Sequence, residues 1–334
     1  MKLSKLVIGL AVGLVGLGLL APVPSSGGQG GKTWTVCPQG CDFPRIQEAI
    51  DAAVDGDTIL IKASGIYREN LTITKSLTIA PDRAFAFPVV LQPAGAFIGP
   101  VITVKGERAI RVTFESLIVQ GVGLEQISAI TILGQANVSL NDIEIGPSLY
   151  FGLIVYDQAQ VMVKNSRFSG NGASAIIISG SAQAVLEDSI VFANGVTGIN
   201  ISEKGQLRVT RSAIFRTKLD LIGPGISIAA GDQSKVVIEG SLIYDNNLDG
   251  VLASESSTVE IINSVIANNG RSGVLLINNP TVIVKESIIH SNPWGIAAWL
   301  LKCGFDRDWY SGGTVQIDQA TVFVRNSKGD VCLP

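Results

Sequence analysis

The sequence predicts an all-β solenoid, in which coils of roughly 23 residues stack on one another and pair their strands in parallel. Three observations support this fold class. Small residues recur at a nearly constant interval, apolar residues alternate between them, and turn-forming residues separate the apolar runs.

The repeat rests on three series of residues in one register. A small residue opens an apolar run at steps of 23, 23, 27, 25, 23 and 22 residues: Gly152, Ala175, Gly198, Gly225, Gly250, Gly273 and Gly295. A serine follows each small residue by 14 positions, or by 16 in one coil: Ser166, Ser189, Ser212, Ser241, Ser264 and Ser287. Five residues later come Asn171, Asn194, Thr217, Asn246, Asn269 and Asn292. A fixed period of this length indicates stacked structural repeats.

The residues around each serine indicate strands. In the first of these coils Val161, Val163 and Phe168 lie five before, three before and two after Ser166, and later coils place aliphatic residues at the same positions. Spacing of two with β-branched enrichment is typical of strands, and no run is long enough for a helix. The asparagines then fall in the turns, where stacked amides bond along the rod, so we expect a structural ladder of Asn171, Asn194, Asn246, Asn269 and Asn292.

The first coil is expected to be covered by a short helix. The segment from Asp42 to Ala53 carries an N-cap candidate, an early proline and one apolar face made of Ile46, Ala49, Ile50 and Ala53. The end of a solenoid exposes unpaired strand edges, so a cap is required there.

The last coil is expected to carry an insertion. If Ser327 is its serine, 18 residues are added, roughly 300–317, relative to the spacing of the other coils. Cys303 lies in this segment and Cys332 in the tail, so a disulfide between them would tie both over the last coil.

The four cysteines predict two disulfides. Cys37 and Cys41 lie near one end of the solenoid, whereas Cys303 and Cys332 lie near the other. About ten coils at roughly 4.8 Å each separate the two pairs by on the order of 50 Å. A four-cysteine metal site is therefore not expected, and we predict Cys37–Cys41 and Cys303–Cys332.

The N-terminus has the layout of an export signal. Lys2 and Lys5 precede an apolar run from Leu6 to Ala21, and proline, serine and glycine follow. Residues 1–21 are predicted to be a signal peptide or an uncleaved anchor, 22–33 a Gly/Ser linker, and 34–334 a single domain. The predicted localisation is secreted, cell-surface or periplasmic, with membrane contact only through an uncleaved N-terminal segment.

One segment carries a family resemblance. FPRIQEAIDAAVDGDTILIKASGIYRENLTITKSLTI, residues 43–79, resembles the opening of right-handed parallel β-helix proteins of the pectin lyase-like superfamily. The repeats from Gly152 to Ser287 resemble those of NosD-type and of carbohydrate-binding or sugar-hydrolase members. The resemblance implies an all-β right-handed parallel β-helix with an N-terminal capping helix. It implies little about activity, since lyases, hydrolases, esterases, epimerases, adhesins and non-enzymes share the architecture.

No catalytic motif accompanies the resemblance. Galacturonan hydrolases of the superfamily have paired aspartates and Gly-His-Gly, whereas this chain has neither, and its one histidine, His290, is predicted to be a corner residue. The row expected to face outward in the strand that opens each coil has no carboxylate or cationic group: Ile154, Ile177, Asn200, Ser227, Leu252, Leu275 and Ala297. No motif there supports calcium or two-carboxylate glycoside chemistry. A second outward row is expected to be a solvated charged face: Lys164, Glu187, Thr210, Glu239, Ile262 and Lys285.

Cofactors and nucleic acid are not expected. The NosD-type resemblance implies copper handling, but the mature chain has Met162, His290 and four paired cysteines, too few soft or imidazole ligands for a copper site. A net charge of −3 provides no electrostatic footprint for nucleic acid.

The C-terminal insertion has the richest local chemistry. It combines aromatic rings with charged groups that could hold a sugar ring or a protein partner: Trp294, Trp299, Asp306, Asp308, Trp309 and Tyr310. The alternative is that these rings only cover the apolar end of the solenoid. The sequence thus predicts an exported, non-catalytic scaffold that binds a polysaccharide or a cell-surface protein. The alternative is a polysaccharide lyase or hydrolase with an unrecognised acidic site.

Overall fold

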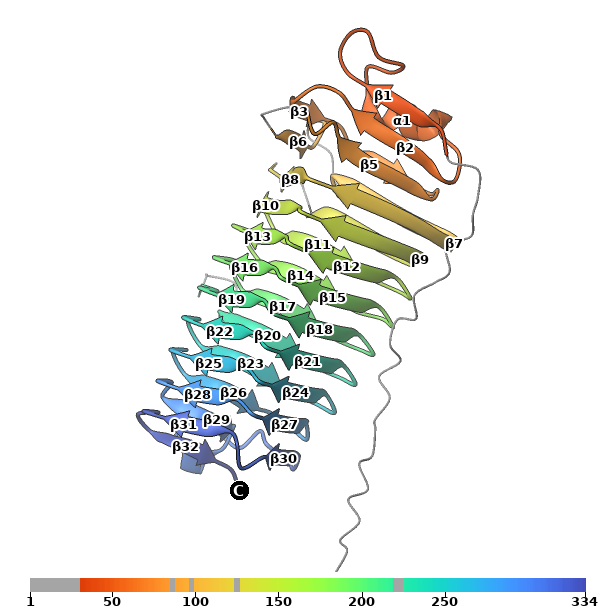
Figure 1. Ribbon diagram of the computed structural model, residues 1–334. Helices are drawn as coiled ribbons and strands as arrows, with labels where there is room; N and C mark the ends of the chain where they lie inside the picture. The colour runs from red at the N-terminus through yellow and green to blue at the C-terminus, as the bar shows by residue number, and fades with distance from the viewer. Residues whose placement is uncertain (1–30, 85–87, 96–98, 123–126, 219–224) are drawn as a thin grey trace, which may run out of the picture. The chain divides into compact units, whose positions relative to one another are not determined.

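The computed structural model describes residues 31–84, 88–95, 99–122, 127–218 and 225–334. The predicted signal or anchor and residues 22–30 of the predicted linker lie outside this part. Residues 31–334 form one compact unit of stacked coils (Figure 1). Its first strand, β1 (Thr33–Val36), begins one residue inside the predicted linker, since Thr33 already pairs with Thr58.

The coils build three parallel sheets. The first sheet contains β4 (Leu71–Ile73), the opening part of β7 (Ile102–Glu115), that of β9 (Ser128–Asn141), β11 (Phe151–Val155), β14 (Ser174–Ile178), β17 (Thr197–Ile201), β20 (Ile226–Ala230), β23 (Asp249–Ala253), β26 (Ser272–Leu276), β29 (Trp294–Ala298) and β32 (Gly329–Cys332). Each strand pairs with its equivalent in the next coil, as the repeat predicts.

The second sheet follows the first along each coil. It contains β1, β2 (Asp57–Ile61), β5 (Leu77–Pro81), the closing parts of β7 and β9, β12 (Gln160–Lys164), β15 (Gln183–Glu187), β18 (Gln206–Thr210), β21 (Lys235–Glu239), β24 (Thr258–Ile262), β27 (Thr281–Lys285) and β30 (Thr314–Ile317). Strands β7 and β9 each continue through the corner between the two sheets, and their pairing shifts register there between Gly106 and Ile110.

The third sheet consists of shorter strands. These are β3 (Gly65–Arg68), β6 (Val89–Gln92), β8 (Leu117–Gly121), β10 (Glu144–Ser148), β13 (Arg167–Ser169), β16 (Ile190–Phe192), β19 (Ala213–Phe215), β22 (Leu242–Tyr244), β25 (Val265–Ala267), β28 (Ile288–His290) and β31 (Val322–Val324). One side-chain row of every sheet points inward, so Val161, Val163 and Phe168 are buried together as predicted. The core is therefore a continuous column of aliphatic side chains.

Two polar ladders run along the corners. Each serine of the second series accepts the backbone N–H of the preceding one, as Ser189 does from Ser166 at 3.0 Å. Asparagine side chains bond in the same way, with Asn171 Nδ2 donating to Asn194 Oδ1 at 2.8 Å and Asn269 Nδ2 to Asn292 Oδ1 at 3.0 Å. These bonds satisfy buried polar groups at most corners, with the hydroxyl of Thr217 as an exception, which makes the ladder structural.

Two positions of the predicted repeat are wrong. Thr197 pairs with Ile226 and Ile199 with Ile228, so the counterpart of Gly198 is the buried Ser227 and not Gly225. The outward residue of β20 is consequently Ala229, which pairs with Asn200. The added residues of this coil precede β20, and with Ser227 the 14-residue interval to Ser241 is kept here too.

The last coil also differs from the prediction. Ser287 N donates to Thr321 Oγ1, and Ile288 pairs with Val322, so Thr321 and not Ser327 takes the serine position. Strand β30 occupies Thr314–Ile317, which the prediction placed in the insertion. The insertion is therefore confined to residues 299–313.

The N-terminal helix forms, but its cap differs from the expected one. Helix α1 (Ile46–Ala52) buries Ile46, Ala49 and Ile50 against the first coil. Asp42 does not cap it, because its carboxylate accepts the N–H and hydroxyl of Thr35. Glu69, from the next coil, accepts the N–H groups of Ile46 and Gln47 at 3.0 Å each. A carboxylate thus satisfies the helix start from a neighbouring element.

Candidate functional site

The insertion lies against the outer face of the first sheet. Cys332 occupies the register position of Ala297, which faces outward, and the predicted Cys303–Cys332 disulfide joins it to the insertion. Leu275 and Ala297, at the outward positions of β26 and β29, are fully buried, whereas Leu252 one coil earlier is half-buried. The insertion was expected over the end of the last coil; it covers a side instead. The second predicted disulfide, Cys37–Cys41, is also present.

Three rings of the insertion form a cluster. The ring centroids of Trp299 and Trp309 are 4.8 Å apart, as are those of Trp299 and Phe305. The guanidinium of Arg271, which precedes β26, lies 4.8 Å from the Trp299 ring. Arg271 also bonds the buried Asp249 through its Nε at 3.1 Å. Burial raises the pKa of the Asp249 carboxyl despite this partner.

Most polar groups of the predicted residues are used inside the insertion. Trp299 Nε1 donates to Asp306 Oδ1 at 3.1 Å, and this bond lowers the pKa of Asp306. Asp308 Oδ1 accepts the N–H of Leu301, the first residue of the 3₁₀ helix η1 (Leu301–Cys303), at 2.7 Å. Both contacts hold the loop in shape. Their acceptors are consequently engaged by the protein.

Trp294 and Tyr310 also use their polar groups within the protein, and Trp309 is the exception. Trp294 Nε1 donates to the Cys303 carbonyl and the Tyr310 hydroxyl to the Gly313 carbonyl, both at 3.0 Å. Trp309 is 43% exposed, and the Arg307 guanidinium lies 4.9 Å from its ring. The structure thus brings all six predicted residues into one region. Of their four rings, that of Trp309 is the one exposed to solvent, and the Arg307 beside it is paired with Asp306 at 3.0 Å.

The charged row of the second sheet is a set of ion pairs. Lys164 lies 3.0 Å from Glu187, Arg208 2.8 Å from Glu239, and Lys285 2.7 Å from Glu260. The hydrogen bond from Lys164, and then that from Arg211, lower the pKa of Glu187. Lys164 and Arg211 therefore keep this carboxylate ionised, which is opposite to what a general acid needs.

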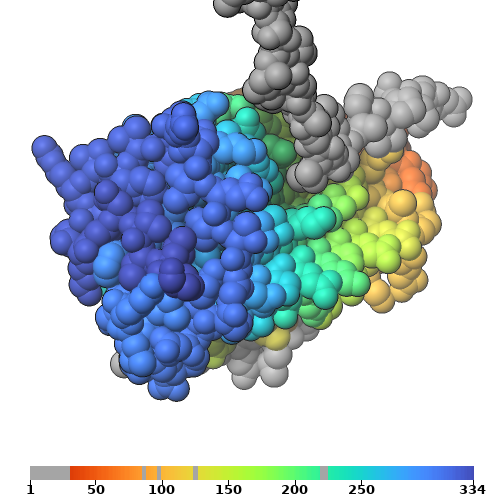
Figure 2. Space-filling model, turned by 90° about the horizontal axis from the view of Figure 1, so that it is seen from below, coloured from red at the N-terminus to blue at the C-terminus, as the bar shows by residue number. Residues whose placement is uncertain are grey.

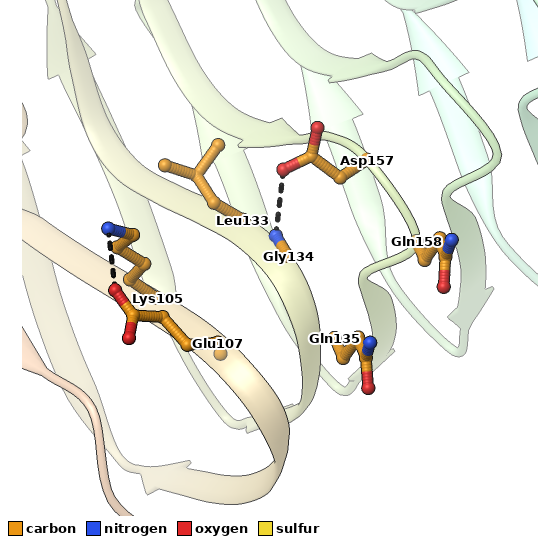
Figure 3. A pocket seen from close by; sticks show the side chains of 8 residues that line it. Lys105, Glu107, Leu133, Gly134, Gln135, Asp157 and Gln158 are labelled. Atoms are coloured by element: carbon orange, nitrogen blue, oxygen red, sulfur yellow. Dashed lines mark hydrogen bonds and ion pairs between the residues drawn. The ribbon is translucent and has the colours of Figure 1, made fainter.

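A groove at the corner between the first and second sheets was not predicted. It has a volume of about 340 Å³ and is lined by Lys105, Gly106, Glu107, Leu133, Gly134, Gln135, Asp157 and Gln158 (Figure 3). Its floor depends on two glycines. A Cβ on Gly106 would lie 2.6 Å from Ala136 N, and one on Gly134, whose φ is +71°, would lie 2.2 Å from Gly106 O. Only glycine allows this close approach of β7 and β9.

The polar groups of the corner groove differ in how firmly they are already bonded within the protein. Asp157 Oδ2 accepts the N–H of Gly134 at 2.9 Å, which fixes the turn, and Lys105 lies 3.0 Å from Glu107 in an exposed pair (Figure 3). An exposed pair of this kind is weak, so Lys105 can exchange partners. The amides of Gln135 and Gln158, on neighbouring coils, bond no group within the described part of the chain.

The corner continues as a second hollow. Gly180, Ser181, Glu203, Lys204, Asp232 and Gln233 line a space of about 390 Å³. Backbone bonds show that the two hollows share one row of stacked turns, because Gln158 N donates to Gly134 O, Ser181 N to Asp157 O, Lys204 N to Gly180 O and Gln233 N to Glu203 O. The two hollows together form a periodic polar surface along the rod. From here on, the term corner groove means both of them.

The described residues contain neither a cluster of potential metal ligands nor a membrane-spanning helix. Within residues 31–334, apart from the undescribed gaps, three or more His, Cys, Asp or Glu side chains do not gather where they could hold a metal ion. Within the same ranges, no helix has the length and apolar character needed to span a bilayer. His290 lies half-buried, with Nδ1 3.0 Å from Ser291 Oγ.

The comparison with protein families identifies the repeat. A family model described as a right-handed beta helix region matches residues 101–233 and 151–322. This match covers most of the coils and confirms the handedness that the sequence resemblance implied. No curated protein sequence is significantly similar to this chain.

Solved structures of three polysaccharide-active proteins are similar in fold. Pectate lyase Pel9A is 14% identical with a TM-score of 0.62, over 89% of this chain and 79% of that one. Alginate lyase from Paenibacillus sp. str. FPU-7 is 14% identical with a TM-score of 0.62, over 90% and 99%. The A-module of Azotobacter vinelandii mannuronan C-5 epimerase AlgE4 is 17% identical with a TM-score of 0.60, over 86% and 90%. Similarity at these identities shows a shared fold only. The chemistry of this chain has to be inferred from its own residues.

Proposed function

Because the chain belongs to the right-handed β-helix family, we propose that it is an exported protein that binds a polysaccharide along the corner groove without cleaving it. The observation that carries the proposal is the periodicity of the groove, in which equivalent turns of successive coils present amide, carboxylate and ammonium groups. A polymer of repeating sugars offers hydroxyl and carboxylate groups at a regular interval. Such groups are bound by amides and lysines through hydrogen bonds.

The names of the structural relatives support the class of ligand. Pectate, alginate and mannuronan are the polysaccharides on which those three proteins act. Lys105 and Lys204 give the corner groove one cation in each hollow that could meet a sugar carboxylate. Tyr156, next to Asp157 in the chain, is exposed and offers a ring face beside the first hollow.

The state of the carboxylates supports binding without cleavage. Asp157 and Asp232 each accept a backbone N–H of the preceding turn, at 2.9 and 2.8 Å, so they stabilise turns. Asp249, whose pKa burial raises, has no exposed surface through which it could reach a substrate. A lyase or hydrolase needs a proton acceptor or donor in contact with the scissile bond. Glu107 and Glu203, which are exposed at the groove, are the carboxylates that the enzymatic alternative would need.

Two disulfides support export. Disulfides persist in oxidising compartments and are rare in the cytosol, and both pairs here lie at or near the ends of the coil stack. Export is also what the Lys2–Ala21 segment predicts.

A glycan array probed with the full chain tests the proposal, with mass spectrometry of the bound sugars. We expect intact uronate-containing chains to be retained. The double variant Gln135→Ala/Gln158→Ala should bind at least roughly tenfold more weakly, since each lost hydrogen bond contributes about 1 kcal/mol. The matched control is Gln183→Ala/Gln206→Ala, two glutamines of the second sheet outside the groove, and it should bind as the unmodified chain does.

Other outcomes would redirect the proposal. Shortened or unsaturated sugars whose formation Glu107→Gln or Glu203→Gln abolishes would establish the enzymatic alternative. Binding that Trp309→Ala removes, while the groove variant still binds, would move the site to the insertion. Absence of binding to every glycan would leave a protein partner as the function.

A further inference from the structure

A cavity separate from the corner groove lies at the start of the third sheet. Its volume is about 430 Å³, and its lining includes Pro38, Pro44, Arg45, Ile66, Tyr67 and Arg68. These residues come from the Cys37–Cys41 loop, from the turn that precedes α1 and from β3. We call this cavity the N-terminal pocket. Figure 2 views the rod from its other end, with the first coils in red and orange at the back.

Much of the wall of the N-terminal pocket is apolar. Pro38, Pro44 and the exposed Ile66 contribute to it, and Tyr67 contributes its ring, because its hydroxyl already donates to a backbone carbonyl at 2.9 Å. Gly65 has a φ of +134°, and a Cβ built there would meet no atom within 4 Å, so the glycine leaves space open. A concave site of this size, with apolar walls and a few polar groups, suits a small organic ligand.

Arg45 is held beside the pocket by a buried carboxylate. Its Nε lies 3.7 Å from Glu69 Oε2, and Glu69 is only 4% exposed. Both oxygens of Glu69 already accept N–H groups of α1, from Ile46 and from Gln47. At 3.7 Å the contact with Arg45 is an ion pair and not a hydrogen bond. The guanidinium of Arg45 is therefore oriented, yet its N–H groups remain available to a ligand.

Arg68 is oriented from the other side, by a short ladder of side chains on the third sheet. Its guanidinium donates to Gln92 Oε1, and Gln92 Nε2 donates to Gln120 Oε1 at 2.8 Å. A guanidinium carries five N–H donors, so most of those of Arg68 stay available. Groups that are positioned by a supporting set of contacts lose little freedom when a ligand arrives.

The charge of the lining favours an anion. Arg45 and Arg68 carry two positive charges and Glu69 one negative charge, which leaves a net charge of +1. Glu69 is buried against α1, so the exposed charges of the lining are the two guanidiniums. A guanidinium binds a carboxylate through two parallel hydrogen bonds, which gives both strength and a defined orientation.

We propose that the N-terminal pocket binds one carboxylated sugar, a uronate, whose carboxylate is bound by Arg45 and Arg68 and whose ring packs against the apolar walls. The carboxylate follows from the two guanidiniums, whereas the choice of a sugar as its carrier rests on the proposed function. A closed pocket of about 430 Å³ accommodates a small ligand or the end of a chain, but not a polymer along its length. The pocket is thus a second site, distinct from the corner groove.

Calorimetric titration of the full chain with glucuronate and with glucose tests the proposal, because these two sugars differ only in the carboxylate. We expect glucuronate to bind with a Kd below about 1 mM and glucose not to bind. Arg68→Gln should weaken glucuronate binding roughly tenfold or more, and Arg68→Lys, which keeps the charge without the fork, should fall between. The matched control is Arg83→Gln, whose guanidinium pairs with Glu115 at 3.1 Å outside the pocket, and it should bind as the unmodified chain does.

The corner-groove variant Gln135→Ala/Gln158→Ala separates this inference from the proposed function. It should bind glucuronate as the unmodified chain does, even where it no longer retains the polymer. Loss of glucuronate binding in this variant would place the sugar in the corner groove and overturn the second site.

Three other results would also overturn the inference. These are no binding of glucuronate, equal binding of glucose, and binding that both Arg68→Gln and Arg45→Gln leave unchanged while circular dichroism shows both variants folded. A capped aspartate, acetylated and amidated, distinguishes the carrier of the carboxylate. If it binds more tightly than glucuronate, the pocket takes an acidic side chain of a protein partner, and the assignment to a sugar fails.

Discussion

The two ends of the rod differ in how their apolar core and strand edges are covered. At the N-terminal end the first coil is sealed by α1, by the Cys37–Cys41 loop and by Asp57, which accepts the N–H groups of Lys32 and Val54 and the indole N–H of Trp34. At the C-terminal end the last coil shows its core and its strand edges. The difference teaches that, among the described residues, local contacts cover the core at one end, whereas Val331 is 42% exposed at the other.

Placing an aspartate in the apolar core at each end of the rod is the clearest test of this difference. Ile50→Asp buries an unpaired carboxylate under α1 and should lower the free energy of unfolding by about 4 kcal/mol. Val331→Asp leaves its charge near water and should lower it by less than about 1 kcal/mol. Urea unfolding monitored by circular dichroism measures both.

Glu48→Gln, on the exposed face of α1, is the control for the helix and should leave stability nearly unchanged. Equal losses for Ile50→Asp and Val331→Asp would mean that the last coil is as well covered as the first, and the contrast between the ends would fail.

The carboxylate of Asp57 should make the N-terminal end sensitive to acid. The backbone hydrogen bond from Val54, followed by those from Trp34 and Lys32, lowers the pKa of Asp57 in the folded protein. Its stabilising contribution is therefore complete above the unfolded-state pKa of about 3.9 and is lost as the pH falls through the lower folded-state pKa. Asp57→Asn should cost about 2 kcal/mol at neutral pH.

The melting temperatures of the Asp57→Asn variant and the unmodified chain, followed from neutral pH downward, measure this effect. The two curves should converge in acid, because a protonated Asp57 and the asparagine that replaces it are both uncharged and similar in shape. Asp51→Asn, on the exposed side of α1, should run parallel to the unmodified chain. A constant gap between the Asp57→Asn curve and that of the unmodified chain at every pH would show that the ionised form is not what holds this end together.

The coils were predictable from the sequence because each repeats one pattern of inward and outward side chains. The two errors fell where residues are added. Gly225 and Ser327 have the right residue type near the right place, and only backbone pairing reveals that Ser227 and Thr321 take those positions. The span of an insertion cannot be read from residue types alone, because a residue of the expected type can occur by chance beside the correct one.

The candidate site was predicted less well, for two physical reasons. The insertion's aromatic and charged residues do gather, but whether Asp306 and Asp308 face a ligand or their own loop is decided by tertiary contacts. The first hollow of the corner groove arises mainly in β7 and β9, before the regular repeat starts at Gly152. Its hollow depends on the missing side chains of Gly106 and Gly134, and glycine in a strand carries no chemical signal of a site.

The smallest expected effect comes from a substitution in the middle of the rod. It tests whether the hydrogen-bonded corners, rather than the two ends, set the stability of this part of the protein. Thr217 interrupts the asparagine ladder, since its N–H donates to Asn246 Oδ1 at 3.0 Å while its buried hydroxyl has no partner in the described residues. In Thr217→Asn the new amide can donate to Asn246 and accept from Asn194, as its neighbours do. We expect a gain of about 1 kcal/mol in the free energy of unfolding. The converse control, Asn246→Thr, lengthens the break and should cost about 1–2 kcal/mol, because it leaves the Thr217 N–H without its acceptor. If both variants change stability in the same direction, the ladder is only a consequence of stacking, and the aliphatic column alone holds successive coils in register.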